Sequence, residues 1–229
     1  MADRILTVVS GGLRSPSSTR LLADQLTAAA RAALVDAGVA VDAHVIELRE
    51  HAHAITDALL TGFPAGALRD ALADVTGADA LVVVSPTFQG SYSGLFKSFL
   101  DLIDAGTLRG VPVVLAATGG TERHSLVIEH ALRPLLSYLG ALTVPTGVYA
   151  ATADFGGDGS AALADRISRA ARELAGLVAG SPVRAAPAPA LVPFAELLAE
   201  TRAPEPSRDA RPPSSSPASS TEEVTGTWR

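Results

Sequence analysis

Two spacings of apolar residues alternate along the first 180 positions of the chain. Short apolar runs rich in valine and isoleucine predict buried strands at 5–9, 45–46, 80–84 and 113–117, with a fifth inside 141–149. Apolar residues three and four positions apart predict helices at 19–37, 67–75, 94–103, 126–139 and 160–178. The segment 51–64 is less regular. The chain therefore alternates strand and helix from its start to about residue 180.

Glycine and proline mark where these elements end. Gly38 follows the first long helix and is a typical helix terminator. We expect the third strand to stop at Ser85 and Pro86, because proline removes a donor from a central ladder. We expect the fourth strand to break at 118–120, and the helix at 126–139 to continue through Pro134.

The alternation predicts one flavodoxin-like α/β domain. Right-handed crossovers between parallel strands place helices on both faces of a doubly wound sheet. Five strands fit the order 2-1-3-4-5, which brings strands one, three and four together. The loops that follow these three strands are the richest in Gly, Ser and Thr. Ligands bind such sheets beyond the carboxyl ends of the strands, so we expect the functional site there.

Composition divides the chain at residue 181. Nine of the 15 prolines lie in 181–229, together with a run of three serines at 214–216. Such a segment buries too little apolar surface to offset the entropy of ordering it. We expect a folded domain over 1–180 and a disordered tail rich in Pro, Ala and Ser over 181–229.

Charge and cysteine content narrow the classes of function. The formal net charge is -6 and the sequence pI is about 5.3, so we expect no nucleic-acid partner. The absence of cysteine excludes disulfides, thiolate metal sites and a cysteine nucleophile, and we expect no metal. The start lacks signal-peptide character, and no stretch of about 18 apolar residues occurs. We therefore expect a cytoplasmic protein with no membrane span.

The first of the three loops, 10–19, carries the chemistry expected of a phosphate site. It leads into a helix, whose N-terminal amides and partial positive charge favour an anion. Four serines and a threonine add hydroxyl donors, and Arg14 can contact two phosphate oxygens. The loop matches neither a Walker motif nor G-x-G-x-x-G, which argues against ATP and dinucleotide-type sites. The alternative is an ordinary turn in which Ser18 or Thr19 caps the helix.

The other two loops carry a family resemblance. Residues 86–101 resemble the P-x-Y-x-x-S-x-x-G-x-L-K-x-x-x-D signature of NAD(P)H-dependent FMN reductases, with Phe88 in place of tyrosine and Phe96 in place of leucine. Residues 118–136 resemble the T-G-G-x-x-x-H-x-L and A-L-x-P-x-L segments of the FMN reductases that serve alkanesulfonate and methanesulfonate monooxygenases. The first loop fits the family pattern S-x-R-x-x-S-x-T, with two extra residues between Ser10 and Arg14.

The resemblance implies an enzyme that transfers hydride from NAD(P)H to FMN and supplies reduced FMN to a partner flavin-dependent monooxygenase. It implies no catalytic side chain, because the flavin carries the chemistry. A homodimer or homotetramer is expected. The implied flavin-binding residues, from the three loops in order, are Ser10, Arg14, Ser17, Ser18, Thr19, Pro86, Thr87, Phe88, Gln89, Ser91, Thr118, Gly119, Gly120 and His124.

Other assignments stay open on sequence alone. The FMN could instead remain tightly bound in a quinone, azo or chromate reductase, or the chain could be a flavodoxin-type electron carrier. The family carries a π-bulge at the position of His130, whereas an ordinary helix is the alternative. Lys97 and Asp101 are expected to form a structural i, i+4 pair. The possible partners for a 2′-phosphate, which would distinguish NADPH from NADH, are Arg14, Arg20 and Arg123.

Overall fold

A parallel sheet organises the computed structural model, which describes residues 4–156 and 159–181. Its strands follow the order β2-β1-β3-β5, and two short strands, β6 and β7, both pair with the outer side of β5. Their bounds are β1 (Arg4–Ser10), β2 (Val41–Glu47), β3 (Ala80–Phe88), β5 (Pro112–Gly119), β6 (Leu142–Thr143) and β7 (Val148–Ala151). A further strand, β4 (Ser91–Tyr92), runs antiparallel to the end of β3. The flavodoxin-like order expected from the sequence is confirmed.

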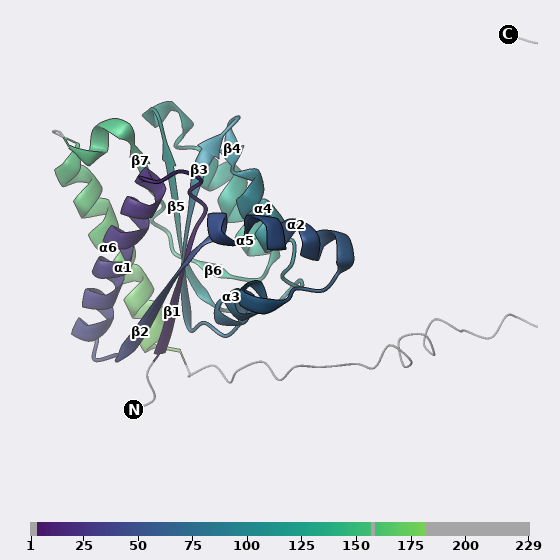
Figure 1. Ribbon diagram of the computed structural model, residues 1–229. Helices are drawn as coiled ribbons and strands as arrows, with labels where there is room; N and C mark the ends of the chain where they lie inside the picture. The colour runs from purple at the N-terminus through teal and green to yellow at the C-terminus, as the bar shows by residue number, and fades with distance from the viewer. Residues whose placement is uncertain (1–3, 157–158, 182–229) are drawn as a thin grey trace, which may run out of the picture. The chain divides into compact units, whose positions relative to one another are not determined.

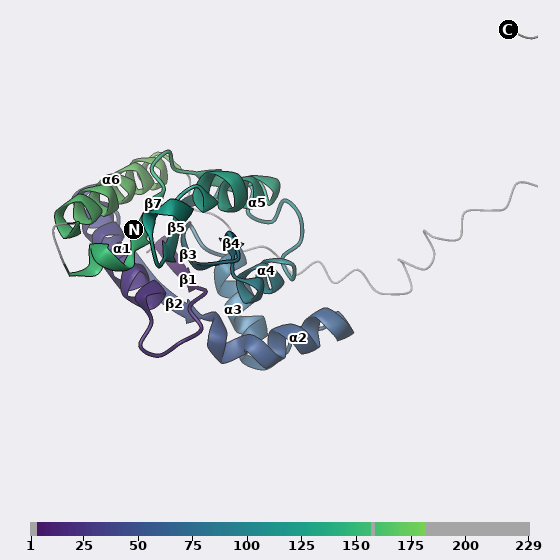
Figure 2. The same ribbon diagram turned by 90° about the horizontal axis from the view of Figure 1, so that it is seen from above.

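Helices cover both faces of this sheet (Figures 1 and 2). On one face lie α1 (Ser18–Asp36) and α6 (Ser160–Ala179), packed on alternate residues of β1, β3 and β5. The opposite face is covered by α2 (Ala52–Thr61), α3 (Gly66–Thr76), α4 (Gly94–Leu100) and α5 (Arg133–Tyr138). Since both faces are covered, the central strands are continuous apolar runs. In the described part of the chain, no helix is long and apolar enough to cross a membrane.

The third strand does not stop at Ser85 and Pro86, as the sequence predicted. β3 continues to Phe88, and Pro86 pairs with Thr118 of β5. The carbonyl of Val84 accepts from the amide of Gly11, so the backbone groups of Val84 point toward β1. The backbone nitrogen of Pro86, two residues later, points to the same side. Pairing between β1 and β3 ends at Val84, so within the described part of the chain Pro86 has no strand partner on that side. The missing proline donor therefore costs no ladder hydrogen bond.

The fourth and fifth strands also differ from their predicted extents. β5 runs through Thr118 and Gly119, because β7 pairs with both residues. This pairing outweighs the low propensity of glycine for strands. The single strand expected within 141–149 is two strands, β6 and β7. Pro145 and Gly147 lie between them and interrupt the pairing.

Three helical predictions need correction. The segment 51–64, expected to be irregular, contains α2, preceded by the 3₁₀ turn η1 (Leu48–His51). α4 ends at Leu100, three residues before the predicted end. The helix expected over 126–139 is a π-helical turn, η3 (Ile128–Leu132), followed by α5. Its second part begins next to Pro134, which cannot donate to a preceding carbonyl. His130 lies in this π turn, as the family resemblance implied.

Two other predictions concern chain segments at the ends of elements. Gly38 lies one residue beyond the C-cap of α1 and has φ 76°, which confirms its role as a helix terminator. The tail expected over 181–229 lies outside the described residues from position 182.

The segment between β6 and β7 is held by side chains. Arg133 donates to the carbonyl of Val144 (2.9 Å), and the amide of Thr146 donates to Glu173 (2.8 Å).

Candidate functional site

A cleft of about 470 Å³ opens at the carboxyl ends of β1, β3 and β5. All three loops predicted from the sequence contribute to its lining. Of the fourteen predicted residues, ten line this cleft: Arg14, Ser17, Ser18, Thr19, Pro86, Thr87, Phe88, Thr118, Gly119 and Gly120. The order of the strands therefore brings together segments about a hundred residues apart.

The start of α1 forms one end of the cleft. Ser17 is the N-cap of this helix, and its Oγ accepts from the amide of Arg20 at 3.2 Å. The first intrahelical bond runs from the amide of Leu21 to the carbonyl of Ser17 (3.0 Å). The amides of Ser18 and Thr19 therefore have no acceptor within the helix. The cap is Ser17, and the alternative that Ser18 or Thr19 would cap the helix is wrong.

Positive charge at this end of the cleft comes from Arg14. Its side chain is exposed, and it forms no ion pair with any described residue. The preceding segment passes so close to the helix cap that a Cβ on Gly12 would overlap the Oγ of Ser17. Glycine at this position lets the loop keep both the cap and the exposed arginine at the cleft.

A buried hydrogen bond joins the first loop to the third. The hydroxyls of Thr19 and Thr118 lie 2.8 Å apart, and both residues are almost fully buried. Ser10 is also buried, at 1% exposure, and its Oγ has no hydrogen-bond partner among the described residues. Burying a hydroxyl without a partner costs free energy. Ser10 is the last residue of β1 and, although it is a predicted site residue, it does not line the cleft.

The second loop is a tight hairpin between β3 and β4. Its turn uses Gln89 and Gly90, which have φ of 50° and 78°. Phe88 lies at the cleft with 46% of its surface exposed, an unusual position for a large aromatic side chain. Gln89 and Ser91, both predicted site residues, lie in the turn and in β4 and do not line the cleft.

Below the hairpin, a hydrogen-bond chain fixes the start of α4. The amide of Ser93 donates to the Oγ of Ser85 (3.0 Å), and the Oγ of Ser93 accepts from the amide of Phe96 (3.2 Å). Lys97 and Asp101 form the predicted i, i+4 ion pair at the end of the helix. These contacts hold the hairpin but do not reach the cleft.

The third loop contacts Tyr149 of β7. The hydroxyl of Tyr149 donates to the carbonyl of Thr121 at 2.8 Å. A Cβ on Gly119 would overlap this hydroxyl, so glycine is required for the close approach. Burial raises the pKa of the Tyr149 phenol, and the neighbouring Thr87 side chain opposes this rise. Tyr149 therefore stays a neutral donor that supports the loop.

The structure also places residues that the sequence reasoning missed or misplaced. Leu13, Pro16 and Thr152 line the cleft but were not predicted. Thr152 directly follows β7, so the rule that ligands bind beyond strand carboxyl ends could have found it. His124 is exposed in the 3₁₀ turn η2 (Glu122–His124) and does not line the cleft.

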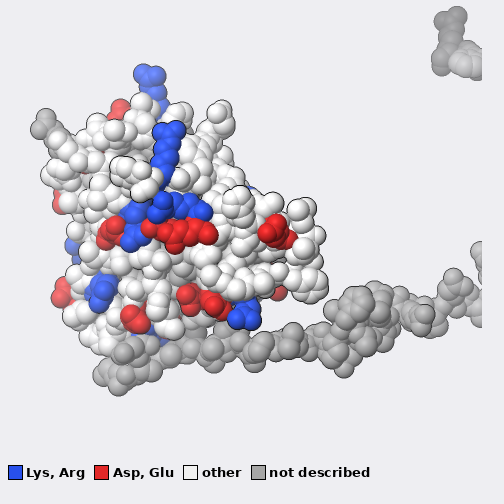
Figure 3. Space-filling view, viewed as in Figure 1, with Lys and Arg blue, Asp and Glu red and all other residues white. Residues whose placement is uncertain are grey.

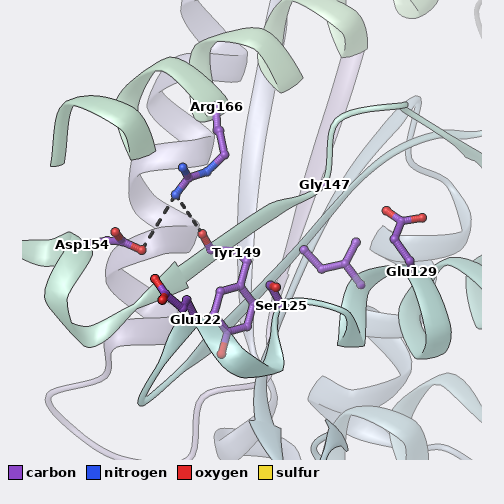
Figure 4. Close-up of a pocket in the computed structure, with 8 residues that line it drawn as sticks. Glu122, Ser125, Glu129, Gly147, Tyr149, Asp154 and Arg166 are labelled. Atoms are coloured by element: carbon purple, nitrogen blue, oxygen red, sulfur yellow. Dashed lines mark hydrogen bonds and ion pairs between the residues drawn. The ribbon is translucent and has the colours of Figure 1, made fainter. Parts of the chain in front are cut away.

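A second pocket of about 370 Å³ is lined by Tyr149, Asp154 and Arg166, among other residues (Figure 4). Arg166 donates to the carbonyl of Tyr149 (3.2 Å) and lies 3.8 Å from Asp154. Asp154 in turn accepts from the amide of Ala151 (2.8 Å). Asp154 and Arg166 are therefore engaged with the backbone of β7, whereas Glu129, on the other side of the pocket, pairs with Arg133.

A network of charges lies beside the first loop. Figure 3 shows basic and acidic side chains crowded across the middle of the face that carries β2 and α1. Glu47, at the end of β2, forms ion pairs with both Arg20 and Arg49. Hydrogen bonding from Arg49, with the charge of Arg20, lowers the pKa of Glu47. Hydrogen bonding to Asp24, with the charge of Glu47, raises the pKa of Arg20.

Comparison with known proteins identifies similar sequences and folds. The model of the family described as NADPH-dependent FMN reductase matches residues 4–156. An FMN reductase (NADPH) from Pseudomonas aeruginosa is 44% identical over 150 residues, which cover 66% of this chain and 78% of the relative. The NADH-dependent FMN reductase SfnE from Pseudomonas putida is 43% identical over 168 residues, covering 72% of this chain and 88% of the relative.

Solved structures of two oxidoreductases are similar to this chain in sequence and in fold. An oxidoreductase from Corynebacterium diphtheriae superposes with a TM-score of 0.77 at 46% identity, covering 80% of this chain and 100% of the other. An NADH:FMN oxidoreductase, EMOB, in its apo form superposes with a TM-score of 0.64 at 27% identity, covering 73% of this chain and 88% of the other.

Proposed function

Since the chain belongs to the NADPH-dependent FMN reductase family, we propose that it transfers hydride from NAD(P)H to FMN bound in the cleft described above. The observation that carries this proposal is the convergence of the three loops on one cleft. One mononucleotide laid across it would meet Arg14 and Ser17 at one end and the segments at Pro86 and Thr118 at the other. A flavin mononucleotide has a phosphate at one end and a planar ring at the other, which suits this arrangement.

The first loop would hold the phosphate. The free amides of Ser18 and Thr19, the guanidinium of Arg14 and the partial positive charge of α1 all favour an anion at the same place. This donor set favours a phosphorylated flavin over riboflavin.

The second and third loops would position the flavin ring. Phe88 offers an exposed aromatic surface, and Gly120 leaves the backbone accessible to a flat ligand. Thr87, Gln89 and the backbone after Pro86 are the residues proposed for the polar edge of the ring. Gln89, Ser91 and His124 lie outside the cleft lining, so their proposed contacts require the hairpin and the η2 turn to approach the ligand.

Bound FMN supplies the hydride acceptor, and the protein contributes position and electrostatics. The loops orient the ring and leave one face of it for the nicotinamide. None of the described residues that line the cleft is a histidine or a carboxylic acid, so no side chain there acts as a general acid. Backbone amides of the third loop would stabilise negative charge that develops on the flavin.

We also propose that reduced FMN leaves the cleft and serves a partner flavin-dependent monooxygenase, as the resemblance implies. The support is the similarity to FMN reductases and a phosphate site on an exposed loop, in which Arg14 and Ser18 remain accessible to solvent. A homodimer or homotetramer stays a prediction.

The test is steady-state oxidation of NADH and NADPH by the purified protein with FMN, FAD or riboflavin as acceptor. We expect FMN-dependent oxidation with a strong preference for FMN over riboflavin. Arg14→Ala should raise the KM for FMN by roughly tenfold and leave the KM for riboflavin unchanged. Arg31→Ala, at an exposed position farther along α1, is the matched control. No FMN binding and no FMN-dependent oxidation would contradict the proposal.

Two other functions were open on sequence alone, and no observation favours either. An FMN-dependent NADPH-azoreductase from Staphylococcus haemolyticus is 33% identical over only 38% of this chain. A flavodoxin, WrbA-like protein from Agrobacterium tumefaciens superposes at 16% identity, which shows the fold alone. Retention of FMN through gel filtration, with quinone reduction, would support the first of these functions.

A further inference from the structure

We propose that a hollow beside the first loop is a second phosphate subsite, which binds the phosphate carried by the adenine-nucleotide half of a dinucleotide. Three arginines build it: Arg14, Arg20 and Arg49. The phosphate is either the 2′-phosphate of NADPH or the second phosphate of FAD. This inference rests on the proposed function, because the hollow acts as an extension of the flavin cleft.

The hollow and the cleft share a wall. The hollow has a volume of about 260 Å³, and Arg14, Pro16 and Ser17 line both it and the cleft. The hollow therefore begins where the phosphate end of the cleft stops, at the N-terminus of α1. A molecule that ends at one phosphate fills the cleft alone. A molecule with a further phosphate can continue past the 14–17 segment into the hollow.

Glu47 fixes two of the arginines side by side. One of its carboxylate oxygens accepts from Nη1 of Arg20, and the other accepts from Nε of Arg49 (2.7 Å). The carboxylate is mostly buried, with 16% of its side chain exposed, so the arrangement is held in place. A guanidinium group carries five N–H donors. Among the described residues, Nη2 of Arg20 and Nη1 of Arg49 have no partner, which leaves donors on both groups for a phosphate.

The charge of the lining suits an anion. Three arginines face two acids, Asp24 and Glu47, whereas the chain as a whole has a net charge of -6. Glu50 reaches Arg49 only at 3.6 Å and does not line the hollow. Arg20 and Arg49 are 37% and 33% exposed, so solvent screens their charges and the expected effect on binding is moderate.

Of the arginines considered from the sequence, the structure brings Arg14 and Arg20 together and adds Arg49, which sequence reasoning did not single out. Arg123 lines neither the cleft nor the hollow. NADH lacks the 2′-phosphate and FMN lacks the second phosphate. The subsite therefore separates NADPH from NADH, or FAD from FMN, without affecting the reaction of NADH with FMN.

The experiment uses the full chain with Arg49→Gln, which removes one guanidinium without touching the flavin cleft. Arg69→Gln is the matched control, because Arg69 is exposed on α3 and, among the described residues, is paired with Asp70 alone. We expect Arg49→Gln to lower either the NADPH-to-NADH ratio of kcat/KM with FMN, or the FAD-to-FMN ratio with NADH, by roughly fivefold. The first result assigns the 2′-phosphate as the ligand, and the second assigns the FAD phosphate.

A binding measurement that needs no turnover accompanies the kinetics. Calorimetric titration with adenosine 2′,5′-bisphosphate and with FAD should show weaker binding of at least one ligand to Arg49→Gln than to wild type. Unchanged ratios and unchanged binding would overturn the proposal, as would an equal fall in every substrate pair, which would indicate a structural role. If the wild type neither binds FMN nor oxidises NADH with it, the proposed function fails, and the titration with the bisphosphate still judges the subsite.

Discussion

At the scale of single residues, the third loop depends on the absence of a side chain at Gly119. The hydroxyl of Tyr149 occupies the space where a Cβ would lie, and it donates to the carbonyl of Thr121. At the neighbouring Gly120, a Cβ would meet no atom within 4 Å. Two adjacent glycines therefore have different roles, the first for packing and the second for access to the cleft.

This difference predicts unequal effects of alanine at the two positions. Gly119→Ala should destabilise the protein by roughly 1–3 kcal/mol, because Tyr149 must move and lose its hydrogen bond. Gly120→Ala should change stability by less than about 0.5 kcal/mol. Chemical denaturation without flavin measures both. Adding Tyr149→Phe to Gly119→Ala should recover part of the loss, and equal effects of the two alanines would contradict the explanation.

Glu47 predicts a dependence of stability on pH. Its pKa lies below the ordinary value of 4.5, chiefly because of hydrogen bonding from Arg49. A lowered folded-state pKa means that the charged carboxylate stabilises the protein above the ordinary pKa, and that this contribution disappears as pH falls through the folded-state pKa. Glu47→Gln should therefore lose less stability than wild type when pH falls from about 5 to about 3.

Thermal unfolding across this pH range checks the prediction. Glu50→Gln is the control, because the side chain of Glu50 is 62% exposed and contacts Arg49 only at 3.6 Å. At neutral pH, Glu47→Gln should be less stable than wild type by roughly 1 kcal/mol. Parallel curves for wild type and Glu47→Gln would show that the two arginines do not depend on this carboxylate.

At the scale of elements, a buried hydrogen bond joins the start of α1 to the end of β5. The hydroxyls of Thr19 and Thr118 are 2.8 Å apart, although the residues are 99 positions apart in the chain. α1 packs on the face of β1, β3 and β5 through apolar residues. The hydroxyl pair sets the end of the helix against the third loop.

A double-mutant cycle tests this coupling. Thr19→Val or Thr118→Val alone should cost roughly 1–3 kcal/mol, because the remaining hydroxyl is buried without a partner. The double variant should cost less than the sum of the two, by about 1 kcal/mol. Denaturant unfolding without flavin gives the three values. Strict additivity would mean that the two hydroxyls do not stabilise each other.

At the scale of the whole molecule, the cleft draws on residues from Leu13 to Thr152. A ligand that contacts all three loops contacts the ends of three strands of one sheet and the helix that follows the first. Such a ligand binds only the folded state, so it stabilises the domain as a unit. The stabilisation depends on ligand concentration relative to Kd.

FMN should therefore raise the unfolding temperature of the protein. At a concentration one hundred times its Kd, it adds about 2.7 kcal/mol to the free energy of unfolding. Riboflavin at the same concentration should raise the temperature much less, since it lacks the phosphate held by the first loop. Scanning calorimetry compares the two ligands, with Arg14→Ala as the variant that should remove most of the difference. Equal shifts for both flavins would contradict a phosphate site at the start of α1.

The sequence by itself determined the strand order, the two helical layers and the three loops at the cleft. Hydrophobic spacing reports which residues face the core, and parallel topology then dictates which strand ends meet. Local signals were less accurate at Pro86, Thr118 and Gly119, where strands continue past residues that usually end them. Propensity describes an isolated segment, and neighbouring strands overrode it here.

Only the tertiary structure decided which side chains meet inside and beside the cleft. Thr19 contacts Thr118, which is 99 residues away in the chain. Tyr149 supports Thr121 across 28 residues, and Glu47 pairs with Arg20 across 27 residues and holds it next to Arg49. None of these contacts follows from spacing along one element, because each depends on how two elements are placed against each other. A sequence pattern fixes the face on which a side chain lies, whereas packing fixes its partner.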